Sequence, residues 1–178
     1  RFWKRNLITW MYLKTTGNSA TFNDYKNFIE QHNDYPRINR IKYLAEQKIY
    51  LRNHSPTSII NWFLKNPPLG GLGKIKLAEA YLEQGKIQEV KSLIKEGWTT
   101  AQISKNNLGY YRAKFKKFLT SEDHLKRADY LAWERKYWDL KRMLKYLPKD
   151  ERALYNARQI LMSNSYGVDN AISKVPTH

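Results

Sequence analysis

The segment from Leu119 to Pro148, LTSEDHLKRADYLAWERKYWDLKRMLKYLP, constrains the fold most because it holds a helix start, two apolar stripes and a turn. Thr120 and Asp123 have the spacing of a capping box, in which each side chain bonds the other residue's backbone N–H. Apolar residues recur at helical spacing on both sides of a break near Arg135: Leu125, Ala128, Leu131 and Ala132 before it, and Leu140, Met143, Leu144 and Leu147 after it. The segment therefore predicts a helical hairpin, and its remaining apolar faces require further helices beside it.

A near copy of this hairpin lies upstream. The stretch 78–94 aligns with 128–144, a shift of fifty residues, and its apolar positions stay in register. The matched pairs are Ala78 with Ala128, Tyr81 with Leu131, Val90 with Leu140, Leu93 with Met143, and Ile94 with Leu144. This shift fits three helices with their loops and predicts a degenerate helical-repeat array. The alternative interpretation is that two unrelated amphipathic helices match after sliding.

Residues that begin or end helices occur at short intervals elsewhere in the chain. The expected signals are Thr21 as N-cap of a helix to about Gln31, Pro36 in the first turn of a helix to about Leu51, Ser55-Pro56 as cap and first residue, Gly85 as a left-handed helix end, and a helix over 151–162. No stretch alternates with period two, so no strands are expected. We predict an all-α fold of about ten helices, an open, curved or U-shaped superhelical array of antiparallel hairpins of the α-solenoid, tetratricopeptide-like type.

Length and composition suit one helical-repeat domain over residues 1–178, with 42% apolar residues to form a core. No run of eighteen uncharged apolar residues occurs, so no membrane span is expected. The chain opens in RFWKRNLITWMYLK, an amphipathic pattern already under way, and we expect it to be part of a longer polypeptide whose targeting signal is missing. It contains no cysteine, which excludes disulfides and thiol chemistry.

The formal net charge is +16, and it permits two interpretations. One is an anionic partner, such as nucleic acid, a membrane surface or a carboxylate-bearing polymer like peptidoglycan. The other is a compositional bias that places lysines on solvated helix faces. Lys114, Lys116 and Lys117 are the nearest approach to a cluster, and no run reaches five or six like charges. We therefore do not expect a nucleic-acid partner.

Candidate catalytic and ligand-binding residues are few, and we expect no catalytic residue, no metal site and no cofactor. Glu122 and Asp123 are expected to cap or be solvated, and Glu79 and Glu83 to be exposed, whereas glycosidase chemistry needs two facing carboxylates. The histidines His32, His54, His124 and His178 are scattered, and His124 is expected to pack or cap. The Leu69-Gly70-Gly71-Leu72-Gly73 run lacks the Ser or Thr of a phosphate loop after Lys74 and is expected to be a flexible helix start.

Aromatic residues are the remaining candidates for binding, since flat rings can stack on sugars. The set is Trp62, Trp98, Trp133, Trp138, Tyr110, Tyr111 and Tyr155. Tyr111 and Phe115 are four residues apart, as in a core stripe, and large aromatics often pack between helices. We expect most of the set to lie in the core, and the substrate-binding residues remain unknown at this stage.

Several short motifs occur in a defined order along the chain: Asp34-Tyr35-Pro36, Pro67-Pro68-Leu69 followed by Leu77-Ala78-Glu79-Ala80, Glu122-Asp123-His124 with Arg127 and Asp129, Trp133-Glu134, Gly167-Val168-Asp169 and Val175-Pro176. Together they resemble the helical N-terminal region of soluble lytic murein transglycosylases over essentially the whole chain. Two positions depart from that pattern: Arg135 stands where the family turn usually has Gly, and Gly70 where Thr is common.

This resemblance implies a non-catalytic superhelical scaffold in a periplasmic bacterial enzyme. The family's C-terminal lysozyme-like domain cleaves the bond between N-acetylmuramic acid and N-acetylglucosamine, and its Glu-Ser and Gly-Leu-Met-Gln motifs are absent from this sequence. The resemblance thus implies that peptidoglycan strands are the partner and that the catalytic activity belongs to the longer protein. A helical-repeat adaptor for protein partners is the alternative function.

Overall fold

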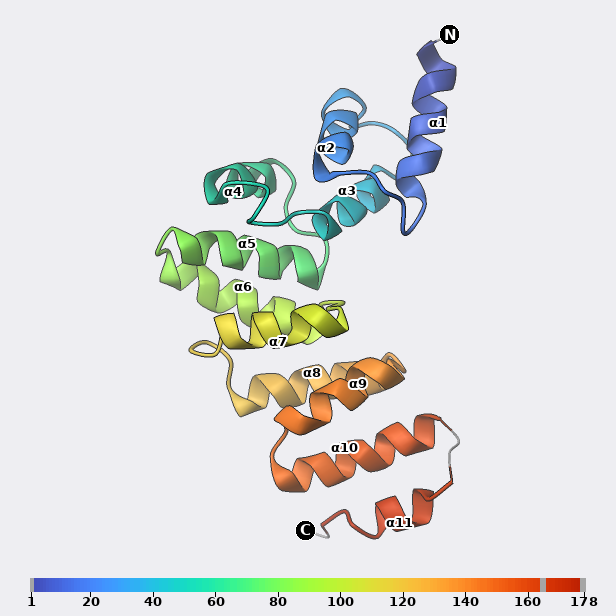
Figure 1. Cartoon of the computed structure of the whole chain (residues 1–178), viewed down its shortest axis with the longest axis vertical. Helices are drawn as coiled ribbons and strands as arrows, with labels where there is room; N and C mark the ends of the chain where they lie inside the picture. Colours follow the sequence, from blue (N-terminus) through green and yellow to red (C-terminus); the bar gives the residue numbers. More distant parts are fainter. Residues whose placement is uncertain (1, 164–165, 177–178) are drawn as a thin grey trace. The chain divides into compact units, whose positions relative to one another are not determined.

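The computed structural model describes residues 2–163 and 166–176, and within them the chain is helical with no strand (Figure 1). The helices are α1 (Phe2–Lys14), α2 (Phe22–Gln31), α3 (Ile38–Gln47), α4 (Pro56–Lys65), α5 (Gly71–Glu83), α6 (Ile87–Thr100), α7 (Lys105–Lys114), α8 (Ser121–Trp133), α9 (Tyr137–Met143), α10 (Lys149–Met162) and α11 (Val168–Ile172), with a 3₁₀ turn, η1 (Leu144–Tyr146). The prediction of an all-α fold is confirmed. The superhelical arrangement of the hairpins stays a prediction.

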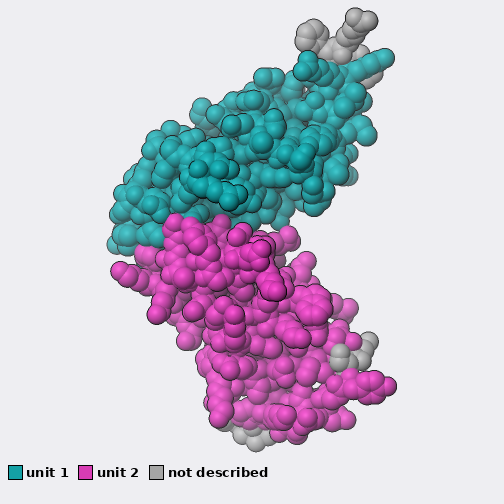
Figure 2. Space-filling model, in the orientation of Figure 1, with its two compact units in different colours: residues 1–93 teal, residues 94–178 magenta. Residues whose placement is uncertain are grey.

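The chain divides into two compact units, residues 1–93 and 94–178, which Figure 2 shows in different colours. In the first unit, α3 contacts both α1 and α5, α2 packs on α3, and α4 packs on α5. Tyr25, Ile41 and Ile59 are fully enclosed in its core. In the second unit, α8 contacts α9 and α10, and α11 packs against α10.

Three helix starts follow the local signals in the sequence. Thr21 and Asp24 form a capping box at α2, and Thr120 and Asp123 form one at α8. Ser55 caps α4, with Pro56 as its first residue. These three predictions are confirmed because each cap joins residues only three apart, so no distant partner is needed.

The third helix begins and ends differently from the prediction. Pro36 lies in the turn before α3, and Arg37 is the N-cap in the left-handed conformation, with φ of 56°. The indole of Trp10 donates to the Pro36 carbonyl oxygen at 2.8 Å and so ties this turn to α1. The helix ends at Gln47, not near Leu51, and the carbonyl of Ile49 accepts from the buried Lys76 on α5 instead. Tertiary partners thus set both ends.

The hairpin shift of fifty residues appears in the helix bounds themselves. Gly71 and Ser121 begin α5 and α8, and Ile87 and Tyr137 begin α6 and α9. Both intervening turns have the same helix-ending pattern: Lys86 N–H donates to the Tyr81 carbonyl at 3.0 Å, and Lys136 N–H to the Leu131 carbonyl at 2.8 Å. The predicted equivalence of the two hairpins is confirmed at this local level.

The residue at the left-handed position differs between the two turns. Gly85 has φ of 71°, as predicted, and Arg135 has φ of 53°. The two turns therefore share the left-handed backbone conformation, and Arg135 adopts it although residues with a Cβ disfavour it.

Candidate functional site

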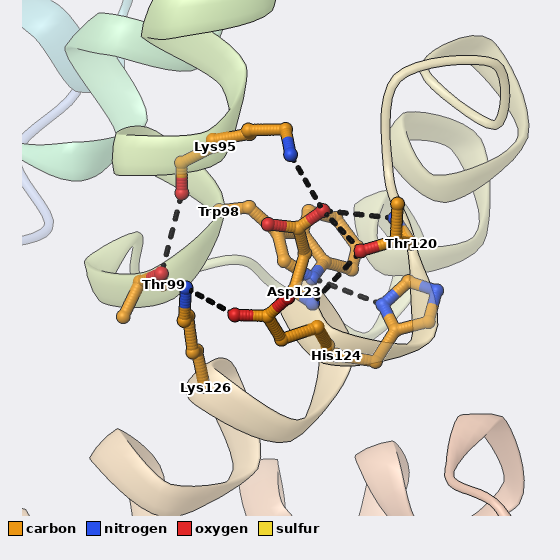
Figure 3. Close-up of polar contacts among 8 residues, drawn as sticks. Lys95, Trp98, Thr99, Thr120, Asp123, His124 and Lys126 are labelled. Carbon is orange, nitrogen blue, oxygen red and sulfur yellow. Dashed lines mark hydrogen bonds and ion pairs between the residues drawn. The ribbon is translucent and has the colours of Figure 1, made fainter.

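The first polar cluster lies at the start of α8, where Asp123 sits between Lys95 and Thr120 (Figure 3). Asp123 accepts from the Thr120 backbone N–H at 2.8 Å, and the Lys95 ammonium lies 3.6 Å away. Burial by itself would raise the pKa of Asp123, but the Thr120 hydrogen bonds and the Lys95 charge outweigh it and hold the pKa below its usual value. Asp123 is therefore an ionised cap.

His124 is buried against Trp98, whose indole N–H donates to Nδ1 of His124 at 3.1 Å (Figure 3). Burial lowers the pKa of His124, and the nearby Arg112 and Arg127 cations lower it further. The imidazole is thus held neutral, with Nδ1 as an acceptor. His124 packs, as predicted.

Arg127 fixes the end of α6 to α8. Its guanidinium is buried, donates from Nη1 to the carbonyls of Trp98 and, at 3.0 Å, Ala101, and lies 5.2 Å from the Trp98 ring. Burial lowers the pKa of Arg127 to about 10. These carbonyls belong to or follow the last turn of α6, where positive charge is favourable. Arg127 therefore has a structural partner for its charge.

The glycine-rich segment before α5 holds a carboxylate of the protein itself. Glu46, from α3, is buried and accepts from the backbone N–H groups of Leu69 at 2.5 Å and Gly70 at 3.1 Å. Burial raises the pKa of Glu46 to about 7, although both N–H groups favour the charged form. The prediction of a flexible helix start missed this bond because Glu46 lies far away in the sequence.

Two glycines in this segment are required by close neighbours. A Cβ on Gly73 would lie 2.5 Å from the Glu46 carboxyl carbon, and one on Gly70 would lie 2.7 Å from the Tyr43 ring. A larger residue at Gly70 would therefore require the Tyr43 ring to shift. Lys76 completes this junction between α3 and α5: its ammonium lies 4.0 Å from the centre of the Tyr50 ring, and burial lowers its pKa to about 8.

The other candidate carboxylates and histidines also have structural surroundings. Glu122 pairs with Lys126 at 2.7 Å on the surface. Glu79 is buried, so the prediction that it is exposed was wrong, because its helix is covered on that side. His54 packs on Phe22 and His32 on Phe28, while His178 lies outside the described residues. Within residues 2–163 and 166–176, no group of three or more His, Asp or Glu side chains is placed to hold a metal ion.

Two grooves in the first unit offer no pair of facing acids. One, of about 370 Å³ between α2 and α4, contains Glu30, whose carboxylate lies 3.9 Å from the Lys26 ammonium. The other, of about 430 Å³ between α1 and α2, contains Asp24, which is bonded to Thr21. Glycoside hydrolysis by two carboxylates needs an acid on each side of the scissile bond. Each of these two grooves has one acidic side chain in its lining and so lacks that arrangement.

The candidate aromatic residues divide into two groups. Trp62, Trp98, Tyr111 and Tyr155 are buried, as predicted for most of the set. Trp133, Trp138 and Tyr110 are exposed by 75%, 63% and 50%, so core packing does not explain them. Spacing could not separate the groups, since Trp133 and Trp138 flank the turn where the apolar stripe is interrupted.

Trp133 and Trp138 lie on either side of one tight turn, at the end of α8 and the start of α9. We call residues 133–141 the tryptophan turn. Tyr137 meets Trp138 edge to face, with ring centres 4.9 Å apart, and the Lys141 ammonium lies 5.4 Å from the Trp138 ring centre. Exposed aromatic rings can stack on a flat apolar surface, and a cation beside them can pair with an anion of the same ligand.

No protein-family model matches this chain, and neither a curated protein nor a solved structure does. Among the described residues, no helix combines the length and the apolar character that crossing a membrane requires.

Proposed function

We propose that this chain is the non-catalytic helical scaffold of a bacterial soluble lytic murein transglycosylase and that it acts in the periplasm. It positions peptidoglycan strands for a C-terminal lysozyme-like domain of the longer protein, which cleaves between N-acetylmuramic acid and N-acetylglucosamine. The ordered motifs resembling that family are the main support.

The observation that carries the proposal is the structural use of the resembling motifs. Asp123, His124 and Arg127 cap α8, pack on Trp98 and bind the end of α6, respectively. The polar groups of these three side chains are engaged in structural contacts within and between helices. This fits a rigid support whose catalytic activity belongs to another domain. The net charge of +16 fits a partner whose stem peptides carry carboxylates.

Purified sacculi test this proposal directly. The chain should bind them, with an affinity that falls as salt rises, and should release no anhydro-muropeptides. Joined to a domain carrying the Glu-Ser and Gly-Leu-Met-Gln motifs, it should raise release over that domain alone. Release by the chain itself, or absence of binding together with no effect on the joined domain, would contradict the proposal.

A helical-repeat adaptor is the second candidate, and an exposed apolar surface on α1 favours it. Ile8, Met11 and Tyr12 are exposed there on one short helix. Contiguous apolar side chains at a surface often mark a protein interface. Tight binding of a protein partner that Met11→Glu abolishes, without binding of sacculi, would support this function over the scaffold.

A further inference from the structure

We propose that the tryptophan turn binds an anionic glycan, with the indoles of Trp133 and Trp138 stacking on sugar rings and the neighbouring cations pairing with carboxylates. This inference rests on the proposed function, because it names the surface through which the scaffold would hold its polymer.

The exposure of the two indoles has no folding reason in the hairpin. Leu131 and Ala132 on α8 and Leu140 on α9 are all buried, so this hairpin has apolar core residues other than the two indoles. The equivalent turn between α5 and α6 keeps the same backbone with Glu83 and Gln88 at the positions of Trp133 and Trp138. The turn geometry therefore does not require aromatic residues at these positions.

Two neighbouring side chains lie beside the Trp138 ring. The Tyr137 ring stands at an interplanar angle of 90° to the indole, with the ring centres 4.9 Å apart. The Lys141 side chain lies one helical turn further along α9, with its ammonium near the ring. A ligand that presents an apolar face and a nearby carboxylate would satisfy both groups.

The local charge of the tryptophan turn is positive and fits a polymer that carries carboxylates. Residues 133–141 carry three cations, Arg135, Lys136 and Lys141, and two acids, Glu134 and Asp139. Asp139 is already paired with Arg142 at 2.5 Å. The remaining balance is positive, so carboxylates on the stems of a glycan strand would meet cations here, and the sequence has no run of five or six like charges of the kind found in nucleic-acid-binding tails.

Binding of linear, uncross-linked peptidoglycan strands by the full chain tests the proposal. Trp133→Ala and Trp138→Ala should each weaken binding about tenfold, as loss of a stacked ring does elsewhere, and Lys141→Gln should weaken it less and reduce its salt dependence. Tyr110→Ala is the matched control, because Tyr110 is also exposed and also lies near a lysine, Lys114. It should leave binding unchanged. Circular dichroism checks that each variant is folded.

Neutral chito-oligosaccharides, single-stranded poly(U) and anionic phospholipid vesicles serve as comparison ligands. The proposal predicts weaker binding of all three, with the chito-oligosaccharide retaining dependence on the tryptophans. If strands bind but both tryptophan variants equal the wild type, the site is wrong while the scaffold function stands. If strands do not bind at all, the site assignment fails, and the scaffold function fails with it when the chain also leaves release by the joined domain unchanged. Tighter, tryptophan-dependent binding of poly(U) or vesicles would also overturn the assignment.

Discussion

Gly73 gives the sharpest test of how the glycine-rich segment is built. A Cβ there would meet the Glu46 carboxyl group at 2.5 Å, and that group is buried and bonded to the Leu69 and Gly70 backbone. In Gly73→Ala the carboxylate must move, and losing a hydrogen bond to a charged group costs about 1.5–3 kcal/mol. Alanine returns about 0.5 kcal/mol of helix propensity in a first turn, so the variant should be about 1–2.5 kcal/mol less stable.

The sign of this effect should reverse when the carboxylate is removed. In a Glu46→Ala background nothing obstructs the new methyl group, so Gly73→Ala should be neutral to stabilising by about 0.5 kcal/mol. Gly109→Ala in α7 is the control, because a Cβ there meets no atom within 4 Å. That variant should gain about 1 kcal/mol from propensity alone.

The assay is urea unfolding followed by circular dichroism and tryptophan fluorescence on the wild type and the variants. Two probes are needed because the chain has two compact units, and their transitions need not coincide. The reasoning is refuted if Gly73→Ala leaves stability unchanged in the wild-type background, or if it destabilises equally with and without Glu46.

Three further predictions concern the two equivalent turns at Gly85 and Arg135 and the buried residues Arg127 and His124. Gly85→Ala should lower the free energy of unfolding by about 1 kcal/mol, and Arg135→Gly should raise it by about 0.5 kcal/mol, since both positions are left-handed; equal signs in urea unfolding would contradict this. Arg127→Met should cost about 3 kcal/mol by leaving the Trp98 and Ala101 carbonyls without their donor, and a neutral result in thermal unfolding would remove the role assigned to it. The depressed pKa of His124 means that below about pH 6.5 the unfolded chain takes up its proton more readily than the folded chain, so the contribution of His124 to stability falls as pH drops from 7 to 5, by at most about 1.4 kcal/mol per pH unit, whereas Glu46, with its pKa raised to about 7, contributes in the opposite direction; the stability of the wild type relative to His124→Gln should therefore fall over this range, and an unchanged difference would exclude the role of His124.

The local helix signals were predictable because their partners are near in sequence. The capping boxes at Thr21 and Thr120 and the left-handed Gly85 each depend on residues within a few positions. The hairpin equivalence was likewise visible in the spacing of apolar residues, since the same side chains face the same neighbours. The all-α fold followed from these signals.

The buried charges were not predictable, because their partners lie far apart in the chain. Glu46 bonds a backbone 23 residues away, and Arg127 bonds a carbonyl 26 residues away. In sequence, Glu46 looks like any charged helix residue, and only a glycine run downstream hints at a close approach. For Arg127, the only hint in the sequence is its position directly before Ala128, a core residue.

The sequence by itself determined where α2, α4 and α8 begin, which faces are apolar and that the hairpin recurs after fifty residues, because these features depend on contacts within one or two turns. Only the tertiary structure decided that α3 starts after Arg37, that Gly70 and Gly73 at the start of α5 closely approach the Glu46 carboxylate, and that Trp133 and Trp138 face solvent. Burial and long-range pairing depend on which helices meet, and spacing along one helix does not contain that information.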